Sequence, residues 1–311
     1  MQSTTIIQEP QSWQQAVRIH VRSHPKVAAG MAIALGVVLL LLLQSLWLIS
    51  TGQAHAYVHW SLLGGLAGFA GTAIGALPAL VIRSVPRKVE DSMLGFAAGM
   101  MLAASAFSLI LPGIESGTRL TGSDWLGVSI VLLGMALGVA LMLGLDEFTP
   151  HEHDKTGPCG PGHEFCGRVW LFVFAIALHN LPEGMAIGVS FADGDLAVAL
   201  PLTSAIAIQD IPEGLAVALA MIAAGFRPIT GVLIAGLSGL LEPLGALLGV
   251  AVSSGWTLAY PVGLGLAAGA MIFVVSHEVI PETHRNGHQT TATLGLMVGF
   301  GLMMALDTAL G

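Results

Sequence analysis

Charged residues are scarce in this chain: they make up 10% of its 311 residues, whereas hydrophobic residues make up 54%. A soluble domain carries about 25% charged residues, so a chain with this few cannot cover a water-facing surface. Glycine is abundant instead, with 40 residues, and membrane helices use glycine for close packing. The composition therefore predicts a protein whose solvent is lipid rather than water.

Basic residues and cysteines are also few, and each shortage excludes a class of protein. The net charge is −8 and the sequence has no basic stripe, which argues against a nucleic-acid partner. The chain has two cysteines, Cys159 and Cys166, close together in one hydrophilic loop. Two cysteines at this spacing do not form a disulfide framework.

Long apolar segments fill most of the chain. A transmembrane helix needs about 20 apolar residues, and nine segments reach that length, with no room for a soluble domain between them. The segments are continuous, whereas a membrane β-barrel shows alternating stretches of about ten residues. We therefore expect an all-α, polytopic membrane helix bundle. The predicted spans are Val27–Ser50, Trp60–Ile82, Ser92–Pro112, Trp125–Leu145, Val169–Phe191, Leu196–Ala224, Pro228–Ser253, Leu258–Val279 and Thr291–Ala309.

These spans divide the chain into three parts. Residues 1–26 are expected to form a cytoplasmic segment, residues 27–50 an extra N-terminal transmembrane helix, and residues 60–311 an eight-helix domain. The first span has a rival interpretation as a signal peptide cleaved near Ala54 and Ala56. Its apolar run of about 24 residues is longer than the core of about 7–15 residues that a signal peptide has. An uncleaved span is therefore favoured.

Basic residues lie almost entirely on one side of the predicted membrane. Ten of the eleven Lys and Arg residues fall in the N-terminal segment or in loops on that same side, and Arg119 alone lies on the other. Cytoplasmic loops are enriched in Lys and Arg. We therefore expect a multi-pass protein of the plasma (inner) membrane, with its N-terminus in the cytoplasm and its C-terminus outside.

Ionisable residues occur inside the spans, where they are costly. Each carboxylate at a span centre costs about 2.5–3.5 kcal/mol, and no Lys or Arg lies within a span interior to neutralise it. Such acids are stable either in the protonated form or with a bound cation, and the neighbouring histidine and amide side chains favour a cation. The ionisable residues in question are His179, Glu183, Asp210, Glu213, Glu242, His277, Glu278 and Asp307.

Two segments with the same pattern, His-Asn-Leu-Pro-Glu-Gly from His179 and Gln-Asp-Ile-Pro-Glu-Gly from Gln209, begin thirty residues apart. Residues at i, i+3 and i, i+4 share a helix face, so each segment presents a chelating pair, and each proline frees a backbone carbonyl. With Glu242, these side chains are enough for two adjacent metal ions. Imidazole with carboxylate suits Zn²⁺ and its neighbours, and Met100 and Met101 are further candidates as thioether ligands.

The two motifs resemble the paired signature helices of the ZIP (zinc–iron permease) family, and the resemblance extends from Trp60 to the C-terminus. It implies a bacterial transporter, not an enzyme, that takes Zn²⁺ and related ions such as Cd²⁺ or Fe²⁺ into the cytoplasm without an organic cofactor. Many relatives have His in place of Gln209, which leaves the metal preference open, and the extra first span lies outside the usual eight-helix pattern. The metal-binding positions that it implies are His179, Asn180, Glu183, Gln209, Asp210, Glu213 and Glu242.

Several other polar residues have two interpretations. His277 and Glu278 lie near the cytoplasmic end of a span, where they fit interfacial snorkelling and a role on the metal exit path equally well. Asp307 lies near the outer end and is expected to be structural. The cytoplasmic loop at 146–168 fits either a metal-capture loop or a solvated linker; its candidate ligands are His151, Glu152, His153, Asp154, Cys159, His163 and Cys166.

Three other functions would use the same residues. Polar side chains can hold membrane helices together, but packing alone does not need four unpaired carboxylates. An intramembrane metalloenzyme of the zincin type is unsupported, because the H-E-x-x-H motif is absent. A cation channel stays open as an alternative, and its flux would not saturate as a carrier's does.

Glycine pairs with G-x-x-x-G spacing, such as Gly95/Gly99 and Gly245/Gly249, are expected to mark close packing of helices. Because glycine is so frequent, these pairs cannot identify an oligomer interface, and a homodimer is left open. The expected partners are divalent metal ions and the lipid bilayer.

Overall fold

The structure, a computed structural model, describes residues 13–51, 56–149, 151–153, 157–159, 168–253 and 257–310. Within these residues the chain is helical apart from one short hairpin, which confirms the predicted all-α class. The first half consists of α1 (Trp13–Ser23), α2 (Pro25–Ser50), α3 (Ala56–Ala76), the 3₁₀ turn η1 (Leu77–Leu80), α4 (Arg87–Ala104), the π-helical turn η2 (Ser105–Ile110), α5 (Leu111–Thr121) and α6 (Asp124–Phe148).

The second half follows the hairpin of β1 (His151–His153) and β2 (Gly157–Cys159), whose strands pair antiparallel. This hairpin occupies part of the predicted hydrophilic loop, and Asp154, His163 and Cys166 lie outside the described residues. The remaining elements are α7 (Arg168–Phe191), α8 (Leu196–Ala223), α9 (Pro228–Ser238), α10 (Leu241–Ser253), α11 (Ala259–Val274), the π-helical turn η4 (Val275–Val279), α12 (Ile280–His284) and α13 (Gln289–Leu310).

Eight helical segments of the described chain are long and apolar enough to cross a membrane, and they match the eight predicted spans from Trp60 onward. The helix α2 is 26 residues long and coincides with the predicted first span, whose insertion in a membrane stays a prediction. The eight segments are Tyr57–Leu80, Arg87–Thr121, Asp124–Phe148, Val169–Phe191, Leu196–Ala223, Pro228–Ser253, Ala259–His284 and Gln289–Leu310.

Two spans continue past the positions at which the sequence analysis ended them. The span predicted to end at Pro112 runs on through η2 and α5 to Thr121, and the span predicted to end at Val279 runs on through α12 to His284. Proline lacks a backbone N–H. A wider π turn lies directly before α5 and α12, whose second residues are Pro112 and Pro281. Such π turns accommodate a local break in the hydrogen-bond ladder, so both helices continue and the predicted ends were too early.

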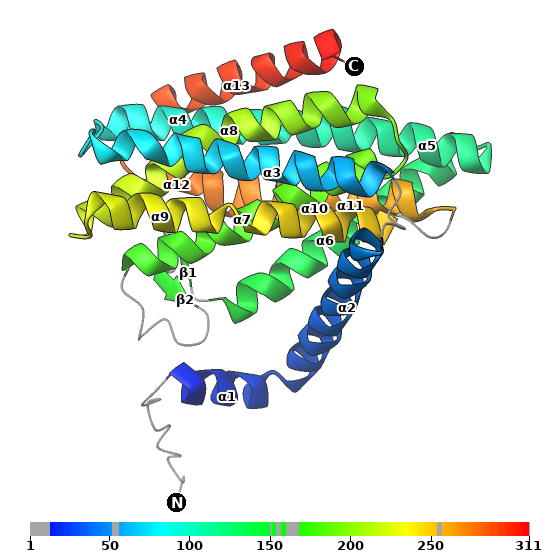
Figure 1. Ribbon diagram of the computed structural model, residues 1–311, viewed down its shortest axis with the longest axis horizontal. Helices are drawn as coiled ribbons and strands as arrows, with labels where there is room; N and C mark the ends of the chain where they lie inside the picture. The colour runs from blue at the N-terminus through cyan, green and yellow to red at the C-terminus, as the bar shows by residue number, and fades with distance from the viewer. Residues whose placement is uncertain are drawn as a thin grey trace, which may run out of the picture.

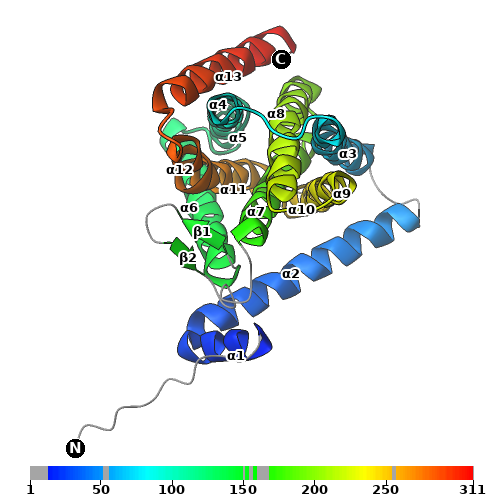
Figure 2. The same cartoon turned by 90° about the vertical axis from the view of Figure 1, so that its left-hand side faces the viewer.

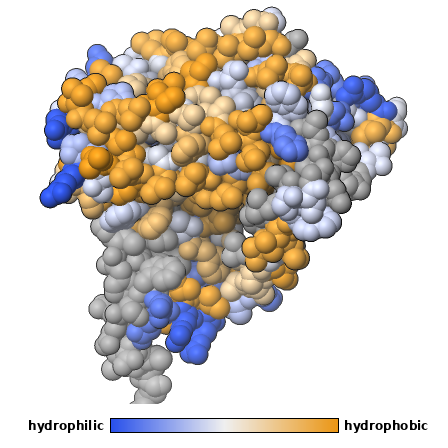
Figure 3. All heavy atoms as spheres, in the orientation of Figure 1, coloured by the Kyte–Doolittle hydropathy of each residue, from blue (hydrophilic) through white to orange (hydrophobic). Residues whose placement is uncertain are grey.

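The eight spans lie side by side as one bundle, and α1 and α2 lie along one side of it, where α2 contacts α10 (Figures 1 and 2). Hydrophobic side chains spread across the visible face of the bundle, and hydrophilic ones gather at its two ends (Figure 3). A helix bundle with an apolar girdle and polar ends suits a bilayer, whose hydrocarbon core is about 30 Å thick. The distribution agrees with the polytopic membrane protein expected from composition.

Glycine positions allow helices to approach closely, as predicted. A Cβ atom added at Gly95 or Gly99 on α4 would collide with the backbone of α13, at Ala292 and Leu296 respectively. Gly245 and Gly249 on α10 face the backbone of α7 in the same way. These glycines are therefore used in packing within the chain, and a homodimer stays a prediction.

Candidate metal centre

Four helices build the polar centre of the bundle: α3 packs on α7, α8 and α10, and α7 packs on α8 and α10. The glycine that ends each signature motif explains part of this packing. A Cβ at Gly184 on α7 would overlap the backbone of Glu242, and a Cβ at Gly214 on α8 would overlap the backbone carbonyl of Thr72. The absence of a side chain at these two positions therefore brings α10 and α3 against the two motif helices.

The seven residues of the predicted metal site are all buried, each at most 3% exposed. Ligand atoms of Glu183, Asp210 and Glu213 lie within 4.8 Å of one another, so the two motif helices bring their carboxylates together. Gln209 Nε2 donates a hydrogen bond to Glu183 Oε1 at 2.6 Å, which joins α8 to α7. The two motifs therefore face each other where α7 and α8 meet.

A second group of contacts joins α8, α10 and α3. Glu242 lies in the first turn of α10, where the helix dipole favours a negative charge, and Thr72 Oγ1 donates a hydrogen bond to Glu242 Oε1 at 2.9 Å. The Gly68 backbone on α3 faces the carboxylates of both Glu242 and Asp210, because either would touch a Cβ placed there. Asp210 therefore lies between the Glu183–Glu213 group and Glu242.

Many ligand atoms at this centre have no hydrogen-bond partner among the described residues. They include both ring nitrogens of His179 and both carboxylate oxygens of Glu213. No Lys or Arg in the described chain forms an ion pair with the carboxylates. Four buried acids cost about 10 kcal/mol or more on insertion scales, which is comparable to the entire stability of a typical protein. The further partnerless atoms are Glu183 Oε2, Asn180 Nδ2, Gln209 Oε1, Asp210 Oδ2 and Glu242 Oε2.

This donor set fits divalent cations. One imidazole, two amide oxygens and four carboxylates converge without a compensating base, and a bound cation would neutralise the acids while it satisfies the partnerless atoms. The amide of Gln209 donates its N–H to Glu183, so its oxygen is left to act as a ligand.

A cavity of about 1040 Å³ leads from one end of the bundle to this centre, and His179 and Glu213 form part of its wall. Its mouth is lined by residues from the beginning of α4 and the end of α12, including Arg87 and Arg285. These lie in the basic loops that the sequence analysis assigned to the cytoplasmic side. The centre is therefore accessible from the end of the bundle that carries the basic residues.

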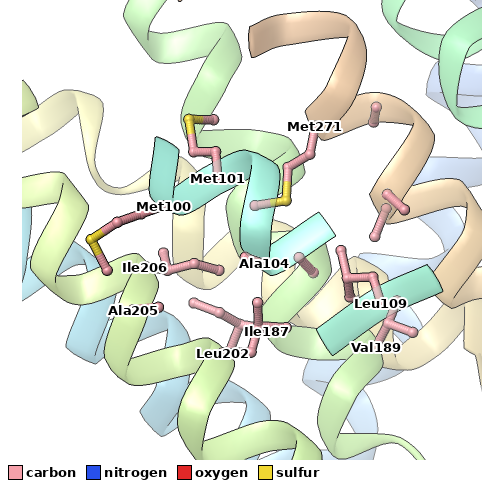
Figure 4. Packing of buried hydrophobic residues seen from close by; sticks show 14 of the residues in the cluster. Met100, Met101, Ala104, Leu109, Ile187, Val189, Leu202, Ala205, Ile206 and Met271 are labelled. Atoms are coloured by element: carbon pink, nitrogen blue, oxygen red, sulfur yellow. The ribbon is translucent and has the colours of Figure 1, made fainter. Parts of the chain in front are cut away.

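An apolar cluster closes the opposite side of the centre. Ile187 follows the motif on α7, and Leu202 and Ile206 precede the motif on α8, so all three lie on the side away from the cavity. They pack with residues of α4 and α11, among them Met101 and Met271, and each of the five is fully buried (Figure 4). Access to the centre is thus one-sided in this conformation.

The remaining site candidates lie outside the central group. Met100 and Met101 belong to the apolar cluster, and their role as thioether ligands stays a prediction. His277 and Glu278 lie on η4, line the cavity and form a separate group with Asp146, whose ligand atoms lie within 4.8 Å of one another. Asp307 accepts a hydrogen bond from Ser108 Oγ at 2.8 Å, as a structural residue would.

Sequence reasoning missed two features, one at the centre and one at the mouth of the cavity. Thr72 and Gly68 on α3 hold and make room for Glu242, yet neither is charged; the dense glycines of that span were the only available signal of close packing. At the cavity mouth, buried Asp91 accepts a hydrogen bond from Asn286 at 2.8 Å and lies 2.7 Å from His288 Nδ1. That network joins α4 to the loop before α13.

The fold and the centre together define a class: a polytopic helical membrane protein with a buried, carboxylate-rich cation site open to one end of its bundle. Residues 149–307 match the family model described as ZIP Zinc transporter. The chain is 63% identical to the zinc transporter ZIPB of Bordetella bronchiseptica, an alignment that covers 93% of this chain and 94% of that relative.

More distant relatives extend the same match. The chain is 42% identical to the zinc transporter GufA of Myxococcus xanthus, over 81% of this chain and 97% of that protein. It is 31% identical to the human zinc transporter ZIP11, over 83% of this chain and 99% of the relative. The chain belongs to the ZIP family, whose members are transporters rather than enzymes. The metalloenzyme alternative is therefore excluded.

Proposed function

We propose that this chain is a carrier that moves Zn²⁺, and related ions such as Cd²⁺ or Fe²⁺, across the inner membrane into the cytoplasm. The observation that carries the proposal is the convergence of partnerless ligand atoms from α7, α8 and α10 at the inner end of the cavity. The names of the relatives, all zinc transporters, support zinc as the main substrate.

The metal site is proposed to hold two adjacent ions. The contact of Gln209 with Glu183 supports one ion nearer the cavity, bound by these residues together with His179 and Glu213. The closeness of Asp210 and Glu242 to Gly68 supports a second ion, with Asn180 as its neutral ligand. Glu183 and Glu213 are proposed to bridge the two ions, because their ligand atoms lie within 4.8 Å of Asp210.

The path of the ion is proposed to follow the cavity. One-sided access is what a carrier requires, because a site open to both sides at once would conduct as a channel. The apolar cluster around Met101 and Met271 would exclude hydrated ions on the outer side in this conformation. His277 and Glu278 line the cavity and are proposed to act on the exit path rather than as interfacial side chains. The basic residues at the mouth support the cytoplasm as the destination.

Zinc uptake into proteoliposomes tests this function. Wild-type protein should take up Zn²⁺ at a rate that saturates with its concentration, and the combined substitution of His179→Ala and Glu183→Ala should abolish uptake. The matched control, His59→Ala with Glu115→Ala, removes the same residue types at exposed positions and should retain uptake. Full activity of the His179 and Glu183 variant would contradict the proposed site. Flux that rises linearly into the millimolar range would favour a channel.

A further inference from the structure

The N-terminal helix α1 meets the bundle at one small group of side chains. His20 Nε2 lies 3.1 Å from Glu147 Oε1, near the C-terminal end of α6. The His20 ring also packs edge-on against Phe148, with ring centroids 5.1 Å apart. In Figures 1 and 2, α1 lies beneath that end of α6, away from the helices that hold the central site. These contacts tie α1 to α6 through a histidine and a carboxylate.

A second histidine joins this pair. His24 directly follows α1, and its backbone N–H donates a hydrogen bond to the carbonyl of His20 at 3.0 Å. This helical turn places both rings on the same side, with their centroids 4.7 Å apart. One ligand atom from each of His20, His24 and Glu147 can be chosen so that all three lie within 4.8 Å of one another. Ser23 Oγ lies 3.0 Å from His24 Nδ1, which leaves Nε2 of that ring to bind a further group.

The geometry of His20 points to a third participant. Its Nε2 atom is buried and, although close to Glu147, makes no hydrogen bond within the described part of the chain. A nitrogen and an oxygen that approach each other without a directed hydrogen bond are arranged like two ligands of one ion. The basic side chains of α1 do not repel a cation at this position. Arg18 and Arg22 are each two residues from His20, so they lie on the other side of the helix.

We propose that His20, His24 and Glu147 form a second metal site, separate from the transport centre, that binds Zn²⁺ and fastens α1 to α6. Two imidazoles and one carboxylate are ligands that Zn²⁺ prefers, with water in the fourth position. Tetrahedral zinc would hold these ligand atoms about 3.4 Å apart, so side-chain adjustments of about 1 Å close the site. Glu147 has 43% side-chain exposure, which gives the ion and its water access to solvent.

The position of the proposed α1 site suits a regulatory role for the zinc bound there. Asp146, the neighbour of Glu147, belongs to the group with His277 and Glu278, and those two residues line the cavity. Zinc that leaves the cavity therefore reaches the α1 site at the same end of the molecule. The bound ion would fix α1, and through it the start of α2, against the end of α6.

Hydrogen exchange of the full chain tests the site, with ZnCl₂ as the probe. The parent protein carries His179→Ala and Glu183→Ala, which weaken zinc binding at the transport centre, and wild-type protein is measured alongside. At free zinc ten times the Kd, amides in residues 13–23 should exchange about tenfold more slowly. The effect should vanish with His20→Ala or His24→Ala and persist in the control His59→Ala.

A second readout is the number of zinc ions bound per chain. The parent should bind one ion more than the same protein with His20→Ala and His24→Ala added, and Glu147→Gln should weaken binding at this site roughly tenfold or more. If zinc leaves exchange of residues 13–23 unchanged in both the parent and the wild type, the contact is a plain histidine–carboxylate pair and the proposal is overturned. Slowed exchange that survives His20→Ala would overturn it as well. Neither result depends on whether the transport centre carries zinc.

Discussion

Replacing Glu213 by Gln should make the metal-free protein more stable and should remove most of the stabilisation that zinc provides. Glu213, Glu183 and Asp210 have ligand atoms within 4.8 Å of one another, a distance at which two ionised carboxylates repel by about 3.5 kcal/mol at an effective dielectric constant of 20. The Gln209 amide offsets part of this repulsion. We therefore expect the free energy of unfolding of the metal-free protein to increase by about 1–3 kcal/mol, which corresponds to a rise in Tm of about 2–10 °C.

Zinc should stabilise the variant much less than it stabilises the wild type. As a bridging ligand, Glu213 would contact both ions. Loss of a residue that only supports a metal ligand weakens metal affinity about 10- to 100-fold. Loss of Glu213 itself should therefore weaken zinc binding about 100-fold or more. At a zinc concentration 100 times the wild-type Kd, the ion stabilises the wild type by about 2.7 kcal/mol but a variant with 100-fold weaker binding by only about 0.4 kcal/mol.

Thermal unfolding of purified protein in detergent, with and without ZnCl₂, measures both effects, and uptake into proteoliposomes measures the functional loss. Glu115→Gln is the matched control, because Glu115 is exposed on α5 and outside the metal centre. This control should change neither the Tm values nor the rate of uptake. The reasoning is refuted if Glu213→Gln lowers the Tm of the metal-free protein, or if the variant keeps the full zinc-induced shift.

Three further results follow from the same centre. Asn180→Ala, which removes one neutral ligand that water can replace, should lower uptake by less than about tenfold, whereas Glu183→Ala should lower it about 100-fold; the opposite order would contradict a bridging role for Glu183. Zinc binding measured by calorimetry should weaken at least about tenfold from about pH 7 to about pH 5, because the imidazole must be neutral and the carboxylates ionised to bind; an unchanged affinity would count against these ligands. Gly68→Ala places a methyl group against the Glu242 carboxylate and should abolish zinc binding, while Gly301→Ala, where a Cβ meets nothing within 4 Å, should not.

The fold was largely predictable because the bilayer imposes a simple length requirement on the sequence. Apolar runs of about 20 residues marked the eight spans that the structure describes. The ends of two spans were predicted too early, at Pro112 and Val279, because nothing in the sequence indicated the π turns that let these helices continue. The break at Gly239 and Leu240, which splits one span into α9 and α10 and places Glu242 at a helix start, also carried no clear signal.

The metal centre was predictable for a different reason. Charged and amide side chains are rare within apolar spans, so the two motifs containing His179 and Asp210 stood out against their surroundings. The contribution of α3 could not be found in the same way, because Thr72 and Gly68 are small residues that are ordinary in membrane helices. The contact between α1 and α6 was equally hidden, since His20 and Glu147 lie far apart in the sequence and outside the motifs.

The location of bound zinc tests the central claim most directly. Crystals of the full chain grown with ZnCl₂, and measured at wavelengths on both sides of the zinc absorption edge, would show where the ions lie. We predict anomalous peaks between α7 and α8, about 2.0–2.2 Å from His179 and from carboxylate oxygens of both signature motifs. Zinc found at other positions, with none between these two helices at a saturating concentration, would contradict the account.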